Sequence, residues 1–298
     1  FKDRASYEVA LQAKALGEKK IALASTGNAG AAMSAVGAAM GLDIILFVPE
    51  TAPVNKLMQS VLYGAKVVPV KGTYDDAFAL SIAYTQLKGG INRNTAYNPM
   101  TIEGKKSVSI ELFEQMGRKV PDAIYVPVGD GCIIGGVAKG FDDLKKAGLI
   151  EKVPRLIACQ SDASAAISNA IENDDFSAIE ASTRADSISV DLPANGRAAV
   201  RAVKASGGWA VRVSDKEILS SQLVLTKESG VLAEPAAAAA FAALEKDRDH
   251  LVSVLGKKAS ITVLLTGTGF KDMKAFDGAV SLPESIKNSV EAVKALPF

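Results

Sequence analysis

Apolar positions recur along the chain with two different periods, and segments of the two kinds alternate. Short runs rich in branched apolar residues, such as 44–48, have the length and composition of buried strands. Longer segments, such as 3–16, place apolar residues at helical spacing and end at a glycine. This alternation predicts the α/β class, with right-handed β-α-β units that build parallel sheets.

Most of the chain can be assigned to one of the two patterns. The predicted strands are 21–24, 44–48, 66–70, 123–128, 155–159, 208–213 and 260–265. The predicted helices are 3–16, 31–40, 54–62, 74–87, 103–116, 135–144, 163–171, 197–205, 216–227 and 235–245. The polar segment 172–194 follows neither pattern, so we predict a long surface or active-site loop there.

The length of 298 residues is enough for two domains, each with a parallel sheet between layers of helices. We predict a smaller domain over 1–105 and a larger one over 106–298, although the border is weakly marked. The chain starts with Phe1-Lys2-Asp3-Arg4 and runs directly into a helical pattern without an initiator methionine. We therefore expect an N-terminal segment to be missing.

Charge and composition narrow the range of partners. The 34 basic and 33 acidic residues give a net charge of +1, which favours neither nucleic acid nor an anionic membrane. The longest apolar runs are far shorter than the ~20 residues of a membrane-spanning helix. Two cysteines, Cys132 and Cys159, and one histidine are too few for a disulfide framework or a usual zinc site. We expect a small-molecule ligand, no metal and a cytoplasmic location.

Two loops that follow predicted strands could bind a ligand, because ligands of parallel sheets bind beyond the carboxyl ends of the strands. The loop 25–30, Ser-Thr-Gly-Asn-Ala-Gly, contains Asn28, whose amide can donate or accept a hydrogen bond. The loop 129–136 is rich in glycine and precedes a helix, so its amides could hold a phosphate. A carboxylate repels phosphate, so we expect Asp130 to turn away and bond local backbone amides. Taken singly, each loop also fits a structural turn.

A third loop, 266–272, begins with Thr266 at the end of a predicted strand, where its hydroxyl could face the crevice or simply form a turn. At this point the set of motifs resembles the threonine synthases and their relatives among the fold-type II pyridoxal-phosphate enzymes, the tryptophan synthase β superfamily. The start Phe1-Lys2-Asp3-Arg4 is similar to the end of their cofactor-lysine motif. The three loops occur in the same order as in that family, so the resemblance extends from residue 1 to about residue 272.

The resemblance implies pyridoxal 5′-phosphate as cofactor and Lys2 as the catalytic residue that carries it as a Schiff base. It further implies that Asn28 binds the cofactor's 3′-oxygen and that Thr266 faces its pyridine nitrogen. The residues implied around the cofactor phosphate are Gly129, Asp130, Gly131, Cys132 and Ile133. The residues implied at the substrate are Ser25, Thr26, Asn98 and Lys105.

The implied activity is that of a homodimeric threonine synthase, which converts O-phospho-L-homoserine and water to L-threonine and phosphate. One feature departs from this pattern: Thr101 stands where many threonine synthases have an arginine for the substrate phosphate. Lys105 or Lys106 could compensate. The alternatives are a serine/threonine dehydratase or β-replacement synthase of the same fold, and a non-catalytic binding protein. A nicotinamide-dependent oxidoreductase is disfavoured because 25–30 is not a G-x-G-x-x-G loop.

Overall fold

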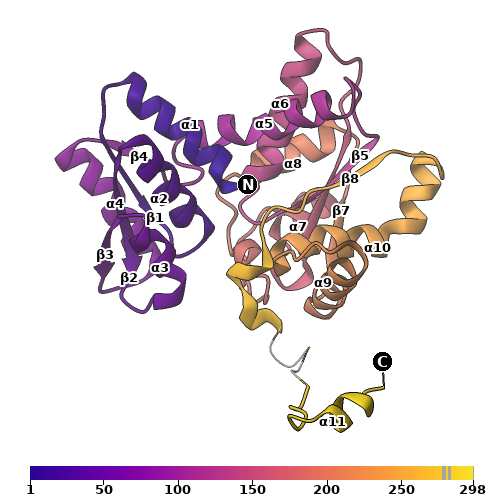
Figure 1. Ribbon diagram of the computed structural model, residues 1–298. Helices are drawn as coiled ribbons and strands as arrows, with labels where there is room; N and C mark the ends of the chain where they lie inside the picture. Colours follow the sequence, from indigo (N-terminus) through magenta and orange to yellow (C-terminus); the bar gives the residue numbers. More distant parts are fainter. Residues whose placement is uncertain (277–279, 281–282, 298) are drawn as a thin grey trace.

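The computed structural model describes residues 1–276, 280 and 283–297, and its strands form two four-stranded parallel sheets (Figure 1). The first sheet has the order β3-β2-β1-β4 and the second has the order β7-β6-β5-β8. The strands are β1 Lys20–Ala24, β2 Asp43–Pro49, β3 Lys66–Val70, β4 Ile91–Asn92, β5 Ala123–Pro127, β6 Arg155–Ser161, β7 Ala210–Val213 and β8 Ile261–Val263.

Helices follow the strands and cover both faces of each sheet (Figure 1). They are α1 Lys2–Ala15, α2 Asn28–Met40, α3 Val54–Leu62, α4 Tyr74–Lys88, α5 Met100–Gln115, α6 Cys132–Lys146, α7 Ala166–Asn173, α8 Gly196–Ala205, α9 Asp215–Ser229 and α10 Pro235–Leu255. A further helix, α11 Val290–Lys294, lies away from both sheets (Figure 1). The predicted fold class, α/β with layered parallel sheets, is confirmed. Within the described residues, no helix has both the length and the apolar character to cross a membrane.

The first sheet is apolar on both faces, as expected for parallel strands covered on each side. Ile21 and Leu23 of β1 pack in a cluster with residues of α1 and α2. Ala22 and Ala24 point to the opposite face, where they pack with Ala77 of α4. This two-sided burial explains why the strand reads as a continuous apolar run rather than as an alternating one.

The second sheet is built in the same way. Tyr125 of β5 packs with the alanine-rich start of α10, and Ile124 and Val126 pack with α6 on the other face. The small side chains of α10, such as Ala239, let this helix lie close to the strands. The first turns of α6 and α10 are thereby fixed against rigid strands.

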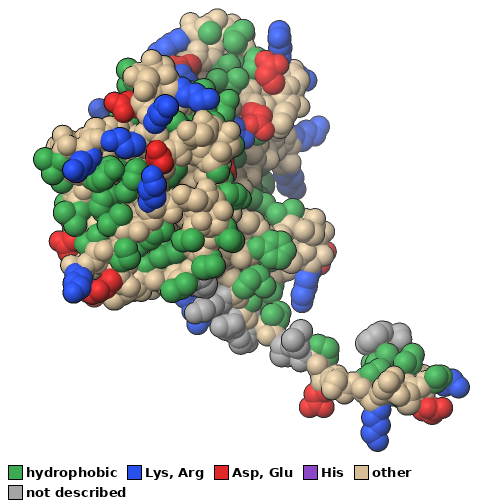
Figure 2. All heavy atoms as spheres, turned by 60° about the vertical axis from the view of Figure 1, so that its left-hand side comes forward, with side chains coloured by type: hydrophobic (Ala, Val, Ile, Leu, Met, Phe, Trp, Pro, Cys, Tyr) green, Lys and Arg blue, Asp and Glu red, His purple; other side chains and the backbone are tan. Residues whose placement is uncertain are grey.

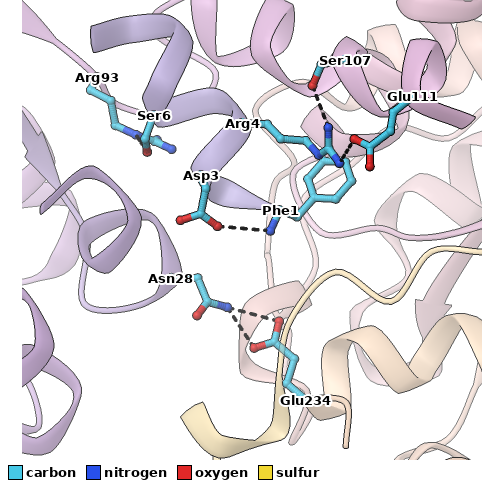
Figure 3. Close-up of polar contacts among 9 residues, drawn as sticks. All are labelled: Phe1, Asp3, Arg4, Ser6, Asn28, Arg93, Ser107, Glu111 and Glu234. Atoms are coloured by element: carbon cyan, nitrogen blue, oxygen red, sulfur yellow. Dashed lines mark hydrogen bonds and ion pairs between the residues drawn. The ribbon is translucent and has the colours of Figure 1, made fainter. Parts of the chain in front are cut away.

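The helix α5 connects the two sheets and contacts both α1 and α6. The predicted border at residue 105 falls inside this helix, and the division into two domains stays a prediction. Arg4 of α1 donates a hydrogen bond to Ser107 Oγ of α5 (3.0 Å) and forms an ion pair with Glu111 (Figure 3). These contacts hold the start of α1 between the two lobes of the chain, one built around each sheet, where the N-terminus lies in Figure 1.

The boundaries of several elements differ from the predicted ones. The helices α2 and α6 each begin three residues earlier than predicted, at Asn28 and Cys132, because the loop residues before them already adopt helical geometry. The helix α10 continues to Leu255 although its second half is polar, since that half lies largely at the surface. The strand β4 was not predicted, because two residues are too short for a periodic signal.

Candidate active site

An inner cavity of about 50 Å³ brings together residues from both halves of the chain. All eight predicted cofactor residues line it: Lys2, Asn28, Gly129, Asp130, Gly131, Cys132, Ile133 and Thr266. A wider outer cavity of about 600 Å³ adjoins it and shares Asn28, Ser187, Glu234 and Ala236 as wall residues. Residues as far apart in the sequence as Phe1 and Thr266 thus meet at one site.

Lys2 is the first residue of α1 and lines the inner cavity. Loss of hydration lowers the pKa of its amine, and the positive charge of Arg93 lowers that pKa further. Both effects favour the neutral amine over the ammonium ion. A neutral amine can attack a carbonyl carbon or accept a proton, so Lys2 has the chemistry required of a Schiff-base lysine.

The first turn of α6 faces the same cavity with an open N-terminus. Gly131 is the N-cap residue, has φ +80°, and offers no side-chain cap. The first amides of a helix have no partner within the helix, and they carry the positive end of the helix dipole. A Cβ atom at residue 131 would lie 2.7 Å from Ala199 Cβ, so the close approach requires glycine. This donor set suits the phosphate group of pyridoxal phosphate.

Asp130 is held by the segment before α8. Its Oδ1 accepts a hydrogen bond from the Ala194 amide (3.2 Å), and its carbonyl oxygen accepts one from the Asn195 amide (2.9 Å). Asn195 Nδ2 also donates to the carbonyl of Gly131 (3.1 Å). The carboxylate therefore bonds one backbone amide, as expected in kind, but that amide is 64 residues away and not in the local turn. Together the three bonds fix the shape of the loop.

Thr266 lies at the cavity just after β8, as its position at a strand end predicts. The following segment is fixed by an antiparallel bridge between Thr268 and Ala233. Gly267 packs against the carboxyl group of Glu234, and a Cβ atom there would lie 2.3 Å from Glu234 Oε1. The loop therefore needs glycine directly after Thr266.

Two of the predicted substrate residues lie in the loop after β1. Ser25 is buried, and its Oγ accepts hydrogen bonds from the amides of Gly27 (3.2 Å) and Gly30 (3.0 Å). Its hydroxyl therefore caps the start of α2. Thr26 is partly buried next to Gly27 and Asn28, which line the outer cavity, but Thr26 is not among the residues that line either cavity.

The other two predicted substrate residues lie outside the inner cavity. Asn98 Nδ2 donates to Gln12 Oε1 (3.0 Å) and to the carbonyl of Asn92 (2.9 Å), and Asn98 lines a separate cavity of about 330 Å³. Lys105 is fully buried, and its Nζ donates to the carbonyl of Thr101 (2.9 Å). Burial, reinforced by the charge of Lys2, lowers the pKa of Lys105 to about 7. A substrate role for these two residues stays a prediction.

Two residues at the site were not predicted from the sequence. Glu234 lines both cavities and is almost completely buried. Arg93 is fully buried, its Nη1 donates to Thr95 Oγ1 (2.7 Å), and Thr95 lines the inner cavity. Arg93 follows the unpredicted strand β4, which explains why its place at a strand end was missed. Nothing in the run 233–236 indicates that Glu234 faces Asn28.

Comparison with known proteins shows the family of the chain. Residues 1–267 match the family described as "Pyridoxal-phosphate dependent enzyme". The chain therefore belongs to this family of pyridoxal-phosphate-dependent enzymes, and its cofactor is pyridoxal phosphate.

Within the family the chain is a lyase-type enzyme similar to threonine synthases. It is 32% identical to the threonine synthase of Methanocaldococcus jannaschii over 302 residues, which cover 99% of this chain and 73% of that relative. It is 36% identical to the threonine synthase of Halalkalibacterium halodurans over 277 residues, covering 91% of this chain and 74% of that relative.

Solved structures share the fold at lower sequence identity. The processed form of threonine deaminase isoform 2 from Solanum lycopersicum superposes with a TM-score of 0.76 at 20% identity, covering 94% of this chain and 80% of that one. Maize serine racemase superposes with a TM-score of 0.77 at 20% identity, covering 94% and 82%. At this level of identity the likenesses establish the fold alone.

Proposed function

We propose that this enzyme is a threonine synthase that converts O-phospho-L-homoserine and water to L-threonine and phosphate. The observation that carries the proposal is the inner cavity, where Lys2, Asn28, the start of α6 and Thr266 meet. The similarity to threonine synthases supports the choice among reactions that this arrangement could catalyse.

In this proposal Lys2 removes the proton from the substrate α-carbon. Its lowered pKa shifts the balance toward the neutral amine, which is the form that a general base requires. When bound, pyridoxal phosphate draws electrons from the α-carbon and so makes that proton acidic. The amides of Cys132 and Ile133 would hold the cofactor phosphate, and Asn28 and Thr266 would hold its ring.

Thr266 sets the expected type of reaction. A hydroxyl is a neutral partner for a pyridine nitrogen and, unlike a carboxylate, would not keep that nitrogen protonated. With this neutral partner the cofactor would withdraw less charge from the substrate, which would favour expulsion of a β- or γ-substituent over transamination. Phosphate expulsion from O-phosphohomoserine is a reaction of this kind.

The substrate phosphate requires positive charge, and Thr101 cannot supply it. Thr101 is fully buried, and its hydroxyl donates to the carbonyl of Asn98 (2.8 Å). Lys106 is engaged in ion pairs with Glu103 (2.8 Å) and Asp143 (2.9 Å). Arg93 is the better candidate, because its Nη2 has no hydrogen-bond partner among the described residues.

The second candidate is a serine/threonine dehydratase or a β-replacement synthase. It needs no site for a substrate phosphate, so the replacement of the family arginine by Thr101 favours it. A charge-assisted hydrogen bond contributes roughly 1.5–3 kcal/mol, so the loss of one arginine contact weakens phosphate recognition about ten- to a hundredfold unless another cation replaces it.

The deciding experiment compares substrates in one preparation. Phosphate release and threonine formation from O-phosphohomoserine are measured beside ketoacid formation from serine and threonine. We expect the higher kcat/KM for O-phosphohomoserine, and we expect Arg93→Gln to raise the KM for that substrate only. If ketoacid formation has the higher kcat/KM and O-phosphohomoserine is inert, the dehydratase assignment holds instead.

The role of Lys2 is tested separately from the substrate. Borohydride should fix the cofactor to the wild-type chain, and peptide mapping should place the label on Lys2. The Lys2→Ala variant should take up no label and should lack activity with every substrate. A label on Lys271, or on any other lysine of the wild-type protein, would refute the assignment.

The proposal includes a homodimer in the cytoplasm. Large apolar side chains on α3 and α4, among them Val54, Leu62 and Leu87, are exposed in the single chain. Figure 2 shows hydrophobic side chains gathered on the face of the lobe that carries these helices. Both cysteines are unpaired and buried, which suits a reducing compartment. Light scattering would measure the mass in solution, and a monomer would refute the dimer.

A further inference from the structure

A hydrogen bond joins the two halves of the chain across the cavity. Asn28 Nδ2 donates to both carboxylate oxygens of Glu234, at 2.9 and 3.2 Å (Figure 3). Asn28 is the first residue of α2, and Glu234 is the N-cap residue of α10. The pair therefore links the helix after β1 of the first sheet to a helix that packs on the second sheet.

The position of the Glu234 carboxylate is fixed independently of Asn28. The amide of Glu234 donates to the carbonyl of Gly267 (3.0 Å), and the carbonyl of Glu234 accepts from Ala237 and Ala238 (both 2.9 Å). Glu234 is 5% exposed, and its carboxyl group lies against Gly267. The backbone and the packing thus hold this carboxylate where Asn28 must meet it.

A carboxylate dictates which way the Asn28 amide faces. An ionised carboxyl group only accepts hydrogen bonds, so it can bind the NH₂ end of an amide but not the carbonyl end. Burial raises the pKa of Glu234, and the bond from Asn28 and the charge of Lys2 offset only part of that rise. The geometry itself places Asn28 Nδ2 within hydrogen-bond distance of both carboxylate oxygens. The amide therefore presents its NH₂ group to Glu234, and one of its two N–H groups remains for another acceptor.

We propose that Glu234 is a positioning residue, which fixes the Asn28 amide so that its second N–H donates to the 3′-oxygen of pyridoxal phosphate. The inference rests on the proposed role of Asn28 in cofactor binding. Without Glu234 the amide can rotate about its side-chain bond, and half of its orientations place a carbonyl oxygen beside the 3′-oxygen. Two acceptors that face each other repel, so cofactor binding weakens.

Two variants of similar size isolate the hydrogen bond. Glu234→Gln keeps an oxygen that can accept from Asn28, whereas Glu234→Met fills the same space without an acceptor of comparable strength. The dissociation constant of pyridoxal phosphate is measured by absorbance titration of the cofactor-free protein. We expect Glu234→Met to raise it about ten- to a hundredfold and Glu234→Gln to raise it only a few fold. Glu228→Met, at an exposed position of α9, should leave it unchanged.

A second ligand separates positioning from a general weakening of the structure. 3-Deoxypyridoxal 5′-phosphate lacks the 3′-oxygen, so the orientation of Asn28 is irrelevant to it. We expect wild-type and Glu234→Met proteins to bind this analogue with equal dissociation constants. If Glu234→Met weakens both ligands by the same factor, Glu234 acts only by joining the two lobes and the proposal is overturned.

The Asn28→Ala background gives an independent check. A residue that acts through Asn28 has no effect once Asn28 is absent, so Glu234→Met should not weaken binding further in Asn28→Ala protein. The inference would be refuted if Glu234→Met weakened cofactor binding by the same factor with and without Asn28. It would also be refuted if Asn28→Ala alone bound the cofactor normally. These assays measure cofactor binding without turnover, so a failure of the threonine synthase assignment would not affect them.

Discussion

The glycine at residue 131 gives the sharpest test of the phosphate site. A residue with a side chain at φ +80° costs about 1–2 kcal/mol of folding free energy relative to glycine. At residue 131 the added Cβ atom would also lie 2.7 Å from Ala199 Cβ and 3.0 Å from the carbonyl oxygen of Asn195. Carbon atoms normally approach to 3.5–4.0 Å, so the start of α6 must shift relative to α8.

Gly148 provides a matched control. It has φ +70° in the turn after α6, and a Cβ atom there would have no neighbour within 4 Å. We expect Gly148→Ala to lower the free energy of unfolding by about 1–2 kcal/mol through the backbone alone. Gly131→Ala should lower it by a further ~1–3 kcal/mol, because the crowded contact adds to the backbone cost.

The affinity for the cofactor shows whether the turn at Gly131 binds the cofactor phosphate or only packs α6 against α8. Urea unfolding of cofactor-free protein measures both stability losses, and absorbance titration measures the dissociation constant of pyridoxal phosphate. A shift of the amides of Cys132 and Ile133 should weaken cofactor binding by about tenfold or more in Gly131→Ala, and Gly148→Ala should bind normally. If folded Gly131→Ala keeps the wild-type dissociation constant, the phosphate lies elsewhere.

Two further predictions concern stability. The pKa of Lys105 is about 7 when the chain is folded and about 10.5 when it is unfolded, so the folded state binds fewer protons between these values. The difference in the free energy of unfolding between the wild type and Lys105→Met should therefore rise by up to about 1.4 kcal/mol per pH unit from pH 7 to 10. A difference that does not change with pH would contradict this. Asp247 accepts hydrogen bonds from Tyr125 and Trp209 (both 2.7 Å), so Asp247→Ala should cost about 1–3 kcal/mol in urea unfolding and shift the fluorescence of the only tryptophan. Wild-type stability and an unchanged emission maximum would refute that network.

Much of the fold was predictable because parallel sheets leave strong local signals. Strands that are buried on both faces read as short apolar runs, and the helices end at glycines such as Gly41 and Gly230 with positive φ. The cavity wall was predictable for the same reason, since its loops follow strands of that kind. Lys2 could be identified only from the motif around it, because a lysine at the start of a helix has no distinctive sequence pattern of its own.

The parts that were missed depend on contacts between distant residues. Asn28 and Glu234 are 206 positions apart, and no periodicity in either segment indicates that they meet. Arg93 follows a strand of two residues, whose pairing with β1 becomes visible only in the assembled sheet. The buried positions of Thr101 and Lys105 likewise follow from the packing of α5 against α6, which the helical pattern alone does not specify.

The distribution of site residues along the chain has a consequence for synthesis on the ribosome. The first sheet is complete once β4 has emerged, so that half can fold while the rest is still being made. The cavity, however, contains both Lys2 and Thr266, which comes 264 residues later in the sequence. A nascent chain therefore cannot assemble the full cofactor site until Thr266 has emerged, and cofactor capture must follow synthesis of the whole stretch between these two residues.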